Sequence, residues 1–191
     1  MPLNLLTHTH IVQAPMLPPA NDQNSIITAA REFLTTFESM QLATVNSIGQ
    51  PMASYAPFVR LDNGQLGIFI SDLAAHTANL RNQPAASALF LEPETQAKQI
   101  FARKRLMLEC TVSMHERESA VSRQVLQAMQ ECFGDIIAQL TPLADFHVFT
   151  LSITQATYVT GFAQASVFSG QLFNASIQHK PERLKVKPSS T

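Results

Sequence analysis

The sequence contains few cysteines and few charged residues. Two of its 191 residues are cysteine, Cys110 and Cys132, which is too few for a disulfide framework or a spaced metal cluster. We expect both to be reduced and mostly buried thiols. Charged residues make up 14% of the chain, against about 25% in typical soluble proteins. This shortage indicates that part of the surface is buried in a partner, most simply a second copy of the chain.

Two kinds of partner are excluded by what the chain lacks. A net charge of −1 provides no global positive field for nucleic acid. No stretch approaches the ~20 apolar residues that a membrane helix needs. Residues 1–20 have neither the basic region nor the uninterrupted apolar region of a secretory signal. We therefore expect a cytoplasmic protein that binds neither nucleic acid nor membrane.

The motifs of several enzyme classes are also missing. The chain has no GxGxxG after a predicted strand, no GxxxxGK[ST], no GxSxG and no HExxH. Nucleotide-fold, P-loop and elbow-type hydrolase functions therefore have no support. His8 and His10 are spaced closely enough to hold a metal, but their segment has no predicted structure, so we interpret any binding there as incidental.

Composition divides the chain into three parts. Residues 1–22 carry four prolines and no apolar period, and we predict that they form an N-terminal arm. Residues 23–170 hold the periodic apolar segments and form the predicted domain, whose length suits one hydrophobic core. Residues 171–191 become polar and end with basic residues and prolines, which is typical of a C-terminal loop or tail.

Apolar spacing predicts three helices. The first follows a cap at Asn24 or Ser25, because apolar residues from Ile26 to Phe37 share one helical face. A second spans 71–84, with Ser71 or Asp72 as its cap, and a third spans 116–133, with Gly134 after its end. Strands are predicted at 41–47, 52–61, 66–71, 85–91, 106–112, 146–153 and 157–162, with a hairpin turn at 62–64.

The order of these elements indicates the fold class. Most connections are too short for the helical crossovers that parallel strands require. We therefore predict a mainly β fold with flanking helices, in which an antiparallel sheet closes into a barrel and so leaves no exposed strand edge.

Four histidines lie beyond the arm. His76 stands beside Thr77 and Asn79 in a polar group at a predicted helix start, which makes these residues candidates for ligand contact. We interpret His115 as a surface residue and His147 as a polar-face residue of a strand with no further role. From the residues alone, His179 belongs to a polar, solvent-exposed tail.

Three segments together resemble a known family. They are LATVNSIGQPMASYAPF at 42–58; ISDLAAHTANLRNQP at 70–84, followed by SALFLEPETQA and ARKRLMLEC; and ADFHVFTL at 144–151, followed by TYVTGFAQA. They are similar to the split-barrel superfamily of pyridoxamine-phosphate oxidase and FMN-binding proteins, in particular to its HugZ/HutZ-type haem-utilisation branch. The resemblance covers about residues 26–170 and implies a split β-barrel that forms an obligate homodimer.

Haem at the dimer interface is the cofactor that this resemblance implies. The family ligates its iron through a histidine of the C-terminal loop, and His179 is the residue here in that place. Asp145 matches the acidic residue that orients the ligand, where a carboxylate fixes the imidazole tautomer. Arg105 matches a basic residue suited to haem propionates, with Arg103 and Lys104 as further candidates. His76 matches a helix-start histidine that lines the pocket.

The resemblance leaves three functions open. The first is oxidative haem degradation in iron acquisition, with electrons from an unidentified external donor. The second is an FMN-dependent oxidoreductase, whose flavin would lie near Ser71, His76, Thr77 and Arg105. Asp72 stands where FMN-binding relatives place a phosphate-binding residue, which weakens this alternative. The third is a haem carrier without enzymatic activity.

Overall fold

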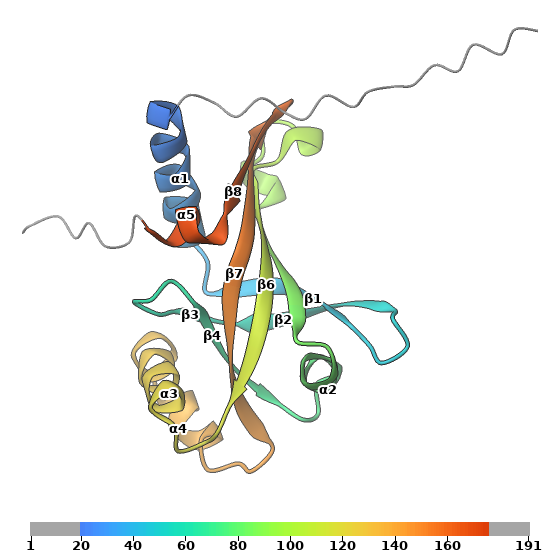
Figure 1. The fold of residues 1–191 in the computed structure, drawn as a ribbon, viewed down its shortest axis with the longest axis vertical. Helices are drawn as coiled ribbons and strands as arrows, with labels where there is room; N and C mark the ends of the chain where they lie inside the picture. Colours follow the sequence, from blue (N-terminus) through green and yellow to red (C-terminus); the bar gives the residue numbers. More distant parts are fainter. Residues whose placement is uncertain (1–19, 176–191) are drawn as a thin grey trace, which may run out of the picture.

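The computed structural model describes residues 20–175, which fold around one antiparallel sheet of eight strands. The strands follow the order β2-β1-β5-β6-β7-β4-β3, and β8 pairs with β7 outside this path. Their bounds are β1 (Ser39–Val45), β2 (Pro51–Pro57), β3 (Val59–Arg60), β4 (Leu66–Ser71), β5 (Ala85–Leu91), β6 (Arg105–His115), β7 (Phe146–Gly161) and β8 (Gln164–Ser169). Figure 1 shows β6 and β7 running the length of the molecule, with β1 to β4 crossing its lower half.

Helices cover the sheet at both ends. One pair, α1 and α5, lies beside β8, while α2, α3 and α4 lie at the other end of β6 and β7 (Figure 1). The helices are α1 (Ala20–Leu34), α2 (Ala75–Asn82), α3 (Ala120–Phe133), α4 (Asp135–Leu140) and α5 (Gly170–Ala175), with short 3₁₀ turns η1 (Glu94–Gln96) and η2 (Ile100–Ala102). Among the described residues, no helix is long and apolar enough to span a bilayer.

Two apolar clusters stabilise this arrangement. The larger one packs α1, through Ile27, Ala30 and Leu34, against the central strands. The smaller one lies under α3, whose Val125 and Met129 contact residues of β3, α4 and β7. Burial of apolar surface is the main favourable term in folding, so these clusters fix both groups of helices on the sheet.

The structure confirms the mainly β, antiparallel fold with flanking helices. All the strand pairs are antiparallel. The turn at 62–64 also forms as expected, with Gly64 at a φ of +84° that glycine adopts without strain. Hydrogen bonding does not close the sheet, however, because β2 and β3 end the strand order and do not pair within residues 20–175.

One strand replaces two that the sequence predicted. The segments 146–153 and 157–162 both belong to β7, a continuous strand of 16 residues. A bulge in β7 makes this possible. Glu109 of β6 pairs with Gln155, but the next residue, Cys110, pairs with Ile153, so Thr154 is skipped. The unpaired Thr154 donates its hydroxyl to the carbonyl of Glu109. A bulge interrupts the two-residue period of the pattern without ending the strand, which explains the error.

Other element bounds differ from the prediction. The first helix begins at Ala20, ahead of the predicted caps Asn24 and Ser25. The second begins at Ala75, because Ser71 still belongs to β4 and Asp72 lies in the turn that follows it. Its N-cap is Ala74, which makes no side-chain hydrogen bond. The predicted strand 52–61 is interrupted after Pro57, since proline cannot donate to a ladder. Strand β8 and helices α4 and α5 were not predicted.

The two thiols have different surroundings. Cys110 is buried in β6, as expected, but Cys132 is exposed on α3, so the prediction that both are mostly buried is wrong for Cys132. Neither forms a disulfide. Burial raises the pKa of the Cys110 thiol to about 12, which keeps it protonated.

Candidate functional site

Polar side chains gather where β4 ends and β7 begins. The last residue of β4, Ser71, pairs with Phe146, the first residue of β7. This register places Ser71 beside Asp145, and its hydroxyl donates a hydrogen bond of 2.6 Å to Oδ2 of that carboxylate. The backbone carbonyl of Asp145 accepts a further bond of 2.8 Å from the N–H of Asp72. Two contacts therefore fix the position of Asp145.

The neighbouring carboxylate, Asp72, pairs with two basic side chains. Its Oδ2 lies 2.9 Å from Nε2 of His147, and its Oδ1 lies 2.7 Å from Nη1 of Arg81. The hydrogen bond from His147, helped by Arg81, lowers the pKa of Asp72 below its ordinary value. We call Ser71, Asp72, Arg81, Asp145 and His147 the strand-end cluster.

The sequence interpretation of His147 is corrected by this cluster. His147 was expected to be a polar-face residue without a further role, yet its Nε2 forms a hydrogen bond of 2.9 Å with Oδ2 of Asp72. Pairing of β4 with β7 places Ile70 opposite His147, so the turn after Ser71 passes the imidazole. Sequence analysis also missed Arg81. Neither residue is adjacent to Asp72 in the chain, and only the strand register brings His147 to it.

Three of the candidate residues selected from the sequence lie on α2 and are buried: His76, Thr77 and Asn79. The hydroxyl of Thr77 donates to the Ser71 carbonyl at 2.6 Å, which holds α2 against the end of β4. The amide of Asn79 donates to Oγ1 of Thr44 at 2.9 Å. These groups thus join α2 to β4 and β1. Cofactor contact through Thr77 or Asn79 stays a prediction, and it would require these donors to change partners.

The third of these residues, His76, has an unsatisfied nitrogen. Its side chain is 8% exposed, and Nε2 is buried without a hydrogen-bond partner among the described residues. Burial disfavours the charged imidazolium and therefore lowers the pKa of His76. A neutral imidazole with a free nitrogen can accept a hydrogen bond or face an apolar group.

The predicted basic residues lie elsewhere in the fold. Arg103 donates through Nε to the Glu92 carbonyl at 3.0 Å and pairs with Glu94 at 3.1 Å, so it fixes the turn between β5 and η1. Arg105 begins β6 and donates to the carbonyl of Arg103. Both residues are partly buried and belong to the end of the sheet that carries η1 and η2.

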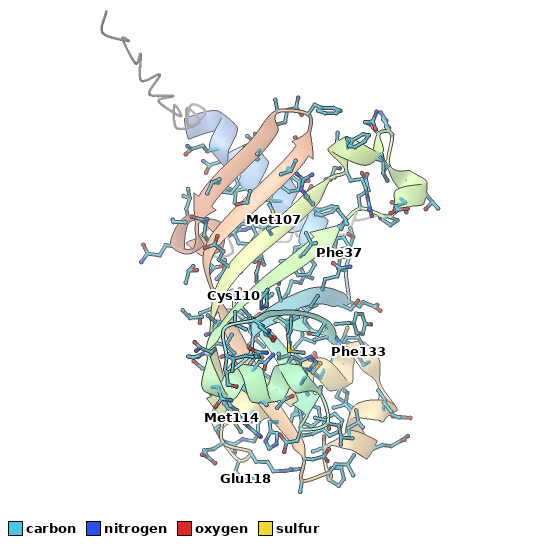
Figure 2. The ribbon with its side chains drawn as sticks, turned by 90° about the vertical axis from the view of Figure 1, so that its right-hand side faces the viewer. Phe37, Met107, Cys110, Met114, Glu118 and Phe133 are labelled. Carbon is cyan, nitrogen blue, oxygen red and sulfur yellow. The ribbon has the colours of Figure 1, made fainter. Side chains whose placement is uncertain are left out.

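Arg105 and Asp145 lie far apart within one chain. Arg105 pairs with Val159, whereas Asp145 directly precedes Phe146, and these partners stand thirteen residues apart on β7. At ~3.3 Å per residue the separation is about 43 Å along the strand. Figure 2 labels Met107, Cys110 and Met114, which follow one another down the neighbouring strand β6 and mark part of this length. A single chain therefore does not bring these two candidates into one site.

A cavity of about 270 Å³ adjoins the strand-end cluster. His147 lines it together with His115, Arg117 and the rings of Phe69 and Phe146. His115 is half-buried, not a free surface residue, and its Nε2 lies 2.7 Å from Oγ1 of Thr150. Sites for drug-sized ligands usually measure about 300–1,000 Å³. A large cofactor at this cluster would need a further surface to enclose it.

The predicted iron ligand, His179, lies outside the described residues, as do His8 and His10. Within residues 20–175, no group of three histidine, cysteine or acidic side chains is placed to hold a metal ion. Asp145 offers a different chemistry. Ser71 occupies Oδ2, and no described residue donates to Oδ1, so Oδ1 can accept the N–H of an incoming imidazole. A carboxylate used in this way orients a histidine ligand.

Comparison with known proteins identifies a family match over most of the chain. The sequence profile described as pyridoxamine 5′-phosphate oxidase matches residues 26–160. Heme oxygenase HutZ of Vibrio cholerae serotype O1 is 45% identical over 140 residues, which cover 73% of this chain and 79% of HutZ.

Solved structures show the same relationship. A crystal structure of HutZ from Vibrio cholerae, described there as a haem storage protein, has 39% identity and a TM-score of 0.62, covering 74% of this chain and 92% of HutZ. ChuZ of Campylobacter jejuni has 30% identity and a TM-score of 0.69, covering 76% of this chain but 60% of ChuZ.

Proposed function

We propose that this chain, which belongs to the pyridoxamine 5′-phosphate oxidase family, is a HutZ-type protein that binds haem for haem-iron utilisation. One observation carries the proposal: HutZ is 45% identical over 79% of its own length. The placement of Asp145 adds support, because its carboxylate is held by Ser71 and keeps one oxygen for an imidazole partner. The absence of disulfides suits the cytoplasmic location that we also propose.

Five of the predicted residues have a role in this proposal. His179 ligates the haem iron, and Asp145 accepts the N–H of its imidazole, which fixes the tautomer and makes the ligand more electron-rich. Ser71 holds Asp145 in place. Arg105 pairs with a propionate, since a guanidinium matches a carboxylate with two parallel bonds. His76 lines the pocket with its unpaired nitrogen.

We further propose that two chains build the site together. About 43 Å of β7 separates the positions of Arg105 and Asp145 in one chain, so both can contact one haem only if a second chain supplies one of them. The cavity beside the strand-end cluster, about 270 Å³, is also too small to enclose a macrocycle alone. A two-fold homodimer would create two equivalent sites.

Mixing two defective variants tests this arrangement. Arg105→Ala and Asp145→Ala are each prepared alone, then mixed, unfolded and refolded together. If each site takes Arg105 from one chain and Asp145 from its partner, random pairing restores about a quarter of the sites to wild-type composition. Haem binding by the mixture should then exceed that of either variant alone. Binding no better than the average of the two variants would contradict a shared site.

For activity, we propose that the protein opens the haem ring. The name heme oxygenase given to HutZ supports this. Bound haem supplies the oxygen chemistry with electrons from an external donor, while the protein supplies ligation and pocket polarity. A carrier without activity would share the same site. The two are separated by adding a reductant and air to the haem complex: loss of the Soret band with iron release marks degradation.

An FMN-dependent oxidoreductase is the alternative, favoured by the match to the pyridoxamine 5′-phosphate oxidase profile over residues 26–160. The position predicted for its phosphate is poorly suited to an anion. Both hydroxyls there donate within the chain, Ser71 to Asp145 and Thr77 to the Ser71 carbonyl, and the carboxylate of Asp72 lies beside them. Yellow, flavin-loaded protein after purification would support this alternative.

A further inference from the structure

A second cavity lies away from the strand-end cluster, between α1, the β3–β4 hairpin and α5. Its volume is about 290 Å³. Figure 1 shows α5 packed beside the lower end of α1, at the opposite side of the molecule from α2. Apolar side chains form most of its wall: Leu34, Leu61, Leu66, Ile153 and Phe173. Arg31, Arg60, Asp62 and Asn174 supply its polar groups.

Arg31 brings an unsatisfied guanidinium to this cavity. Its Nε and Nη2 are both buried and have no hydrogen-bond partner among the described residues. The guanidinium carbon lies over the ring of Phe173, 5.5 Å from its centroid, and this cation–π contact gives the N–H donors no hydrogen-bond acceptor among the nitrogen or oxygen atoms of the cavity. Burial lowers the pKa of Arg31, although arginine stays charged at neutral pH. Buried charged donors without acceptors are costly, which points to a missing anion.

Asn174 adds a second unpartnered group. Its Oδ1 is buried and accepts no hydrogen bond within residues 20–175. The side chain lies directly over Gly64, where a Cβ would come within 2.7 Å of Asn174 Cγ. At the start of α5, a Cβ on Gly170 would lie 1.7 Å from the carbonyl oxygen of Ile153. These two glycines let α5 approach closely and hold Asn174 over the cavity.

The geometry of Arg31 indicates the class of ligand. Nε and Nη2 lie on the same edge of the guanidinium and match the two oxygens of a carboxylate. The cavity contains two arginines and one aspartate, so its formal charge favours an anion. None of these three side chains pairs with another in the described part of the chain. The apolar wall suits the carbon skeleton of an organic acid.

We propose that Arg31, Phe173 and Asn174 form a binding site for a small organic acid. The carboxylate pairs with Nε and Nη2 of Arg31, the carbon skeleton contacts Phe173, and a hydroxyl or amine of the ligand donates to Oδ1 of Asn174. This site is separate from the proposed haem site and does not depend on that function. The carboxylate has two sources, a soluble acid or Glu182 of this chain, which lies outside the described residues.

The Nε–H resonance of Arg31 in a ¹H–¹⁵N NMR spectrum reports on this site directly. Arg31→Lys assigns it, because lysine keeps the charge but lacks the paired N–H donors. The full chain is titrated with 3-hydroxybutyrate, and sodium chloride of equal ionic strength serves as the blank. Arg60→Lys is the matched control, since Arg60 is an exposed arginine lining the same cavity.

We expect a saturable shift of the Arg31 resonance with 3-hydroxybutyrate and none with chloride. Arg31→Lys should weaken binding, measured by calorimetry, by about tenfold or more, because a bond between charged groups is lost. Asn174→Ala should weaken it less, and Arg60→Lys should leave it unchanged. An equal response to chloride, or equal affinity in Arg31→Lys, would overturn the proposal, and unchanged affinity in Asn174→Ala would overturn the role of Asn174.

Glu182→Gln distinguishes the two sources of the carboxylate. If Glu182 occupies the site, this substitution moves the Arg31 resonance in the ligand-free protein and strengthens binding of 3-hydroxybutyrate. If a soluble acid is the ligand, Glu182→Gln changes neither. Both results support carboxylate recognition by Arg31 and name its source. A resonance that responds to neither Glu182→Gln nor 3-hydroxybutyrate would show that the site binds no carboxylate.

Discussion

The hydroxyl of Ser71 lies 2.6 Å from Oδ2 of Asp145 and joins the end of β4 to the residue before β7. The two residues are 74 positions apart in the chain. Strand pairing brings Ser71 opposite Phe146, so the carboxylate is positioned by the sheet and not by its own loop alone. This contact makes Asp145 a defined acceptor in the proposed haem site.

Ser71→Ala removes that hydrogen bond and tests its contribution. A hydrogen bond to a charged group contributes ~1.5–3 kcal/mol, and the partial exposure of Asp145 favours the lower end of this range. We expect the free energy of unfolding, measured by urea denaturation, to fall by about 1.5 kcal/mol. Ser113→Ala, at an exposed position of β6, is the matched control. Equal stability of the two variants would show that the contact with Asp145 contributes nothing.

His147→Ala tests the pairing around Asp72. The imidazole is the largest cause of the lowered pKa of Asp72, so its removal should raise that pKa toward the ordinary value of 3.8. A carboxyl whose pKa is lower in the folded state stabilises the fold above its unfolded pKa, and this stabilisation is lost as the pH falls through the folded pKa. Carbon-13 NMR of the Asp72 carboxyl measures its pKa in the wild-type protein and in the variant. An identical titration in the variant would contradict the pairing.

Burial of His76 predicts a pH dependence of stability. Its pKa is lowered from 6.5, so the unfolded state takes up a proton at a higher pH than the folded state does. The free energy of unfolding should therefore decrease as the pH falls below about 6.5, and the decrease should level off below the folded pKa. His76→Gln removes the titrating group and should flatten this part of the curve in urea denaturation. A curve of unchanged slope would assign the dependence to other groups.

The two thiols should differ in reactivity. Cys132 is exposed, whereas Cys110 is buried with its pKa raised to about 12, and only a thiolate attacks a disulfide reagent. Native protein at about pH 8 should therefore release one equivalent of chromophore from Ellman's reagent, and protein in guanidinium should release two. Cys132→Ser should abolish the native reaction. Fast reaction of both thiols in the native state would contradict the burial of Cys110.

Local sequence patterns predicted much of the fold, because turns, helix caps and amphipathic helices depend on residues that are close together in the chain. The turn at 62–64 and the C-cap at Gly134 depend on the conformations that glycine and asparagine adopt. The amphipathic pattern of α3 depends on burial of one face. The continuity of β7 could not be predicted, since its bulge depends on pairing with β6 and interrupts the alternation on which strand prediction relies.

The strand-end cluster shows the limit of sequence reasoning for the site. The family resemblance selected Ser71 and Asp145, and the structure joins them directly. The two-residue strand pattern assigned no further role to His147, because its partner Asp72 is 75 positions away and only the register of β4 with β7 places them together. Thr77 and Asn79 were selected for their polarity, yet their donors stabilise the packing of α2.

Titration of haem into the purified full chain, followed by absorbance, tests the central proposal most directly. His179→Ala is titrated in parallel. The account predicts a sharp Soret band that saturates in the wild-type protein and is lost in His179→Ala. Asp145→Asn should keep the band but bind haem more weakly, because the orienting carboxylate is gone. Weak, non-saturating uptake of haem by a protein that purifies with bound yellow flavin would contradict the account.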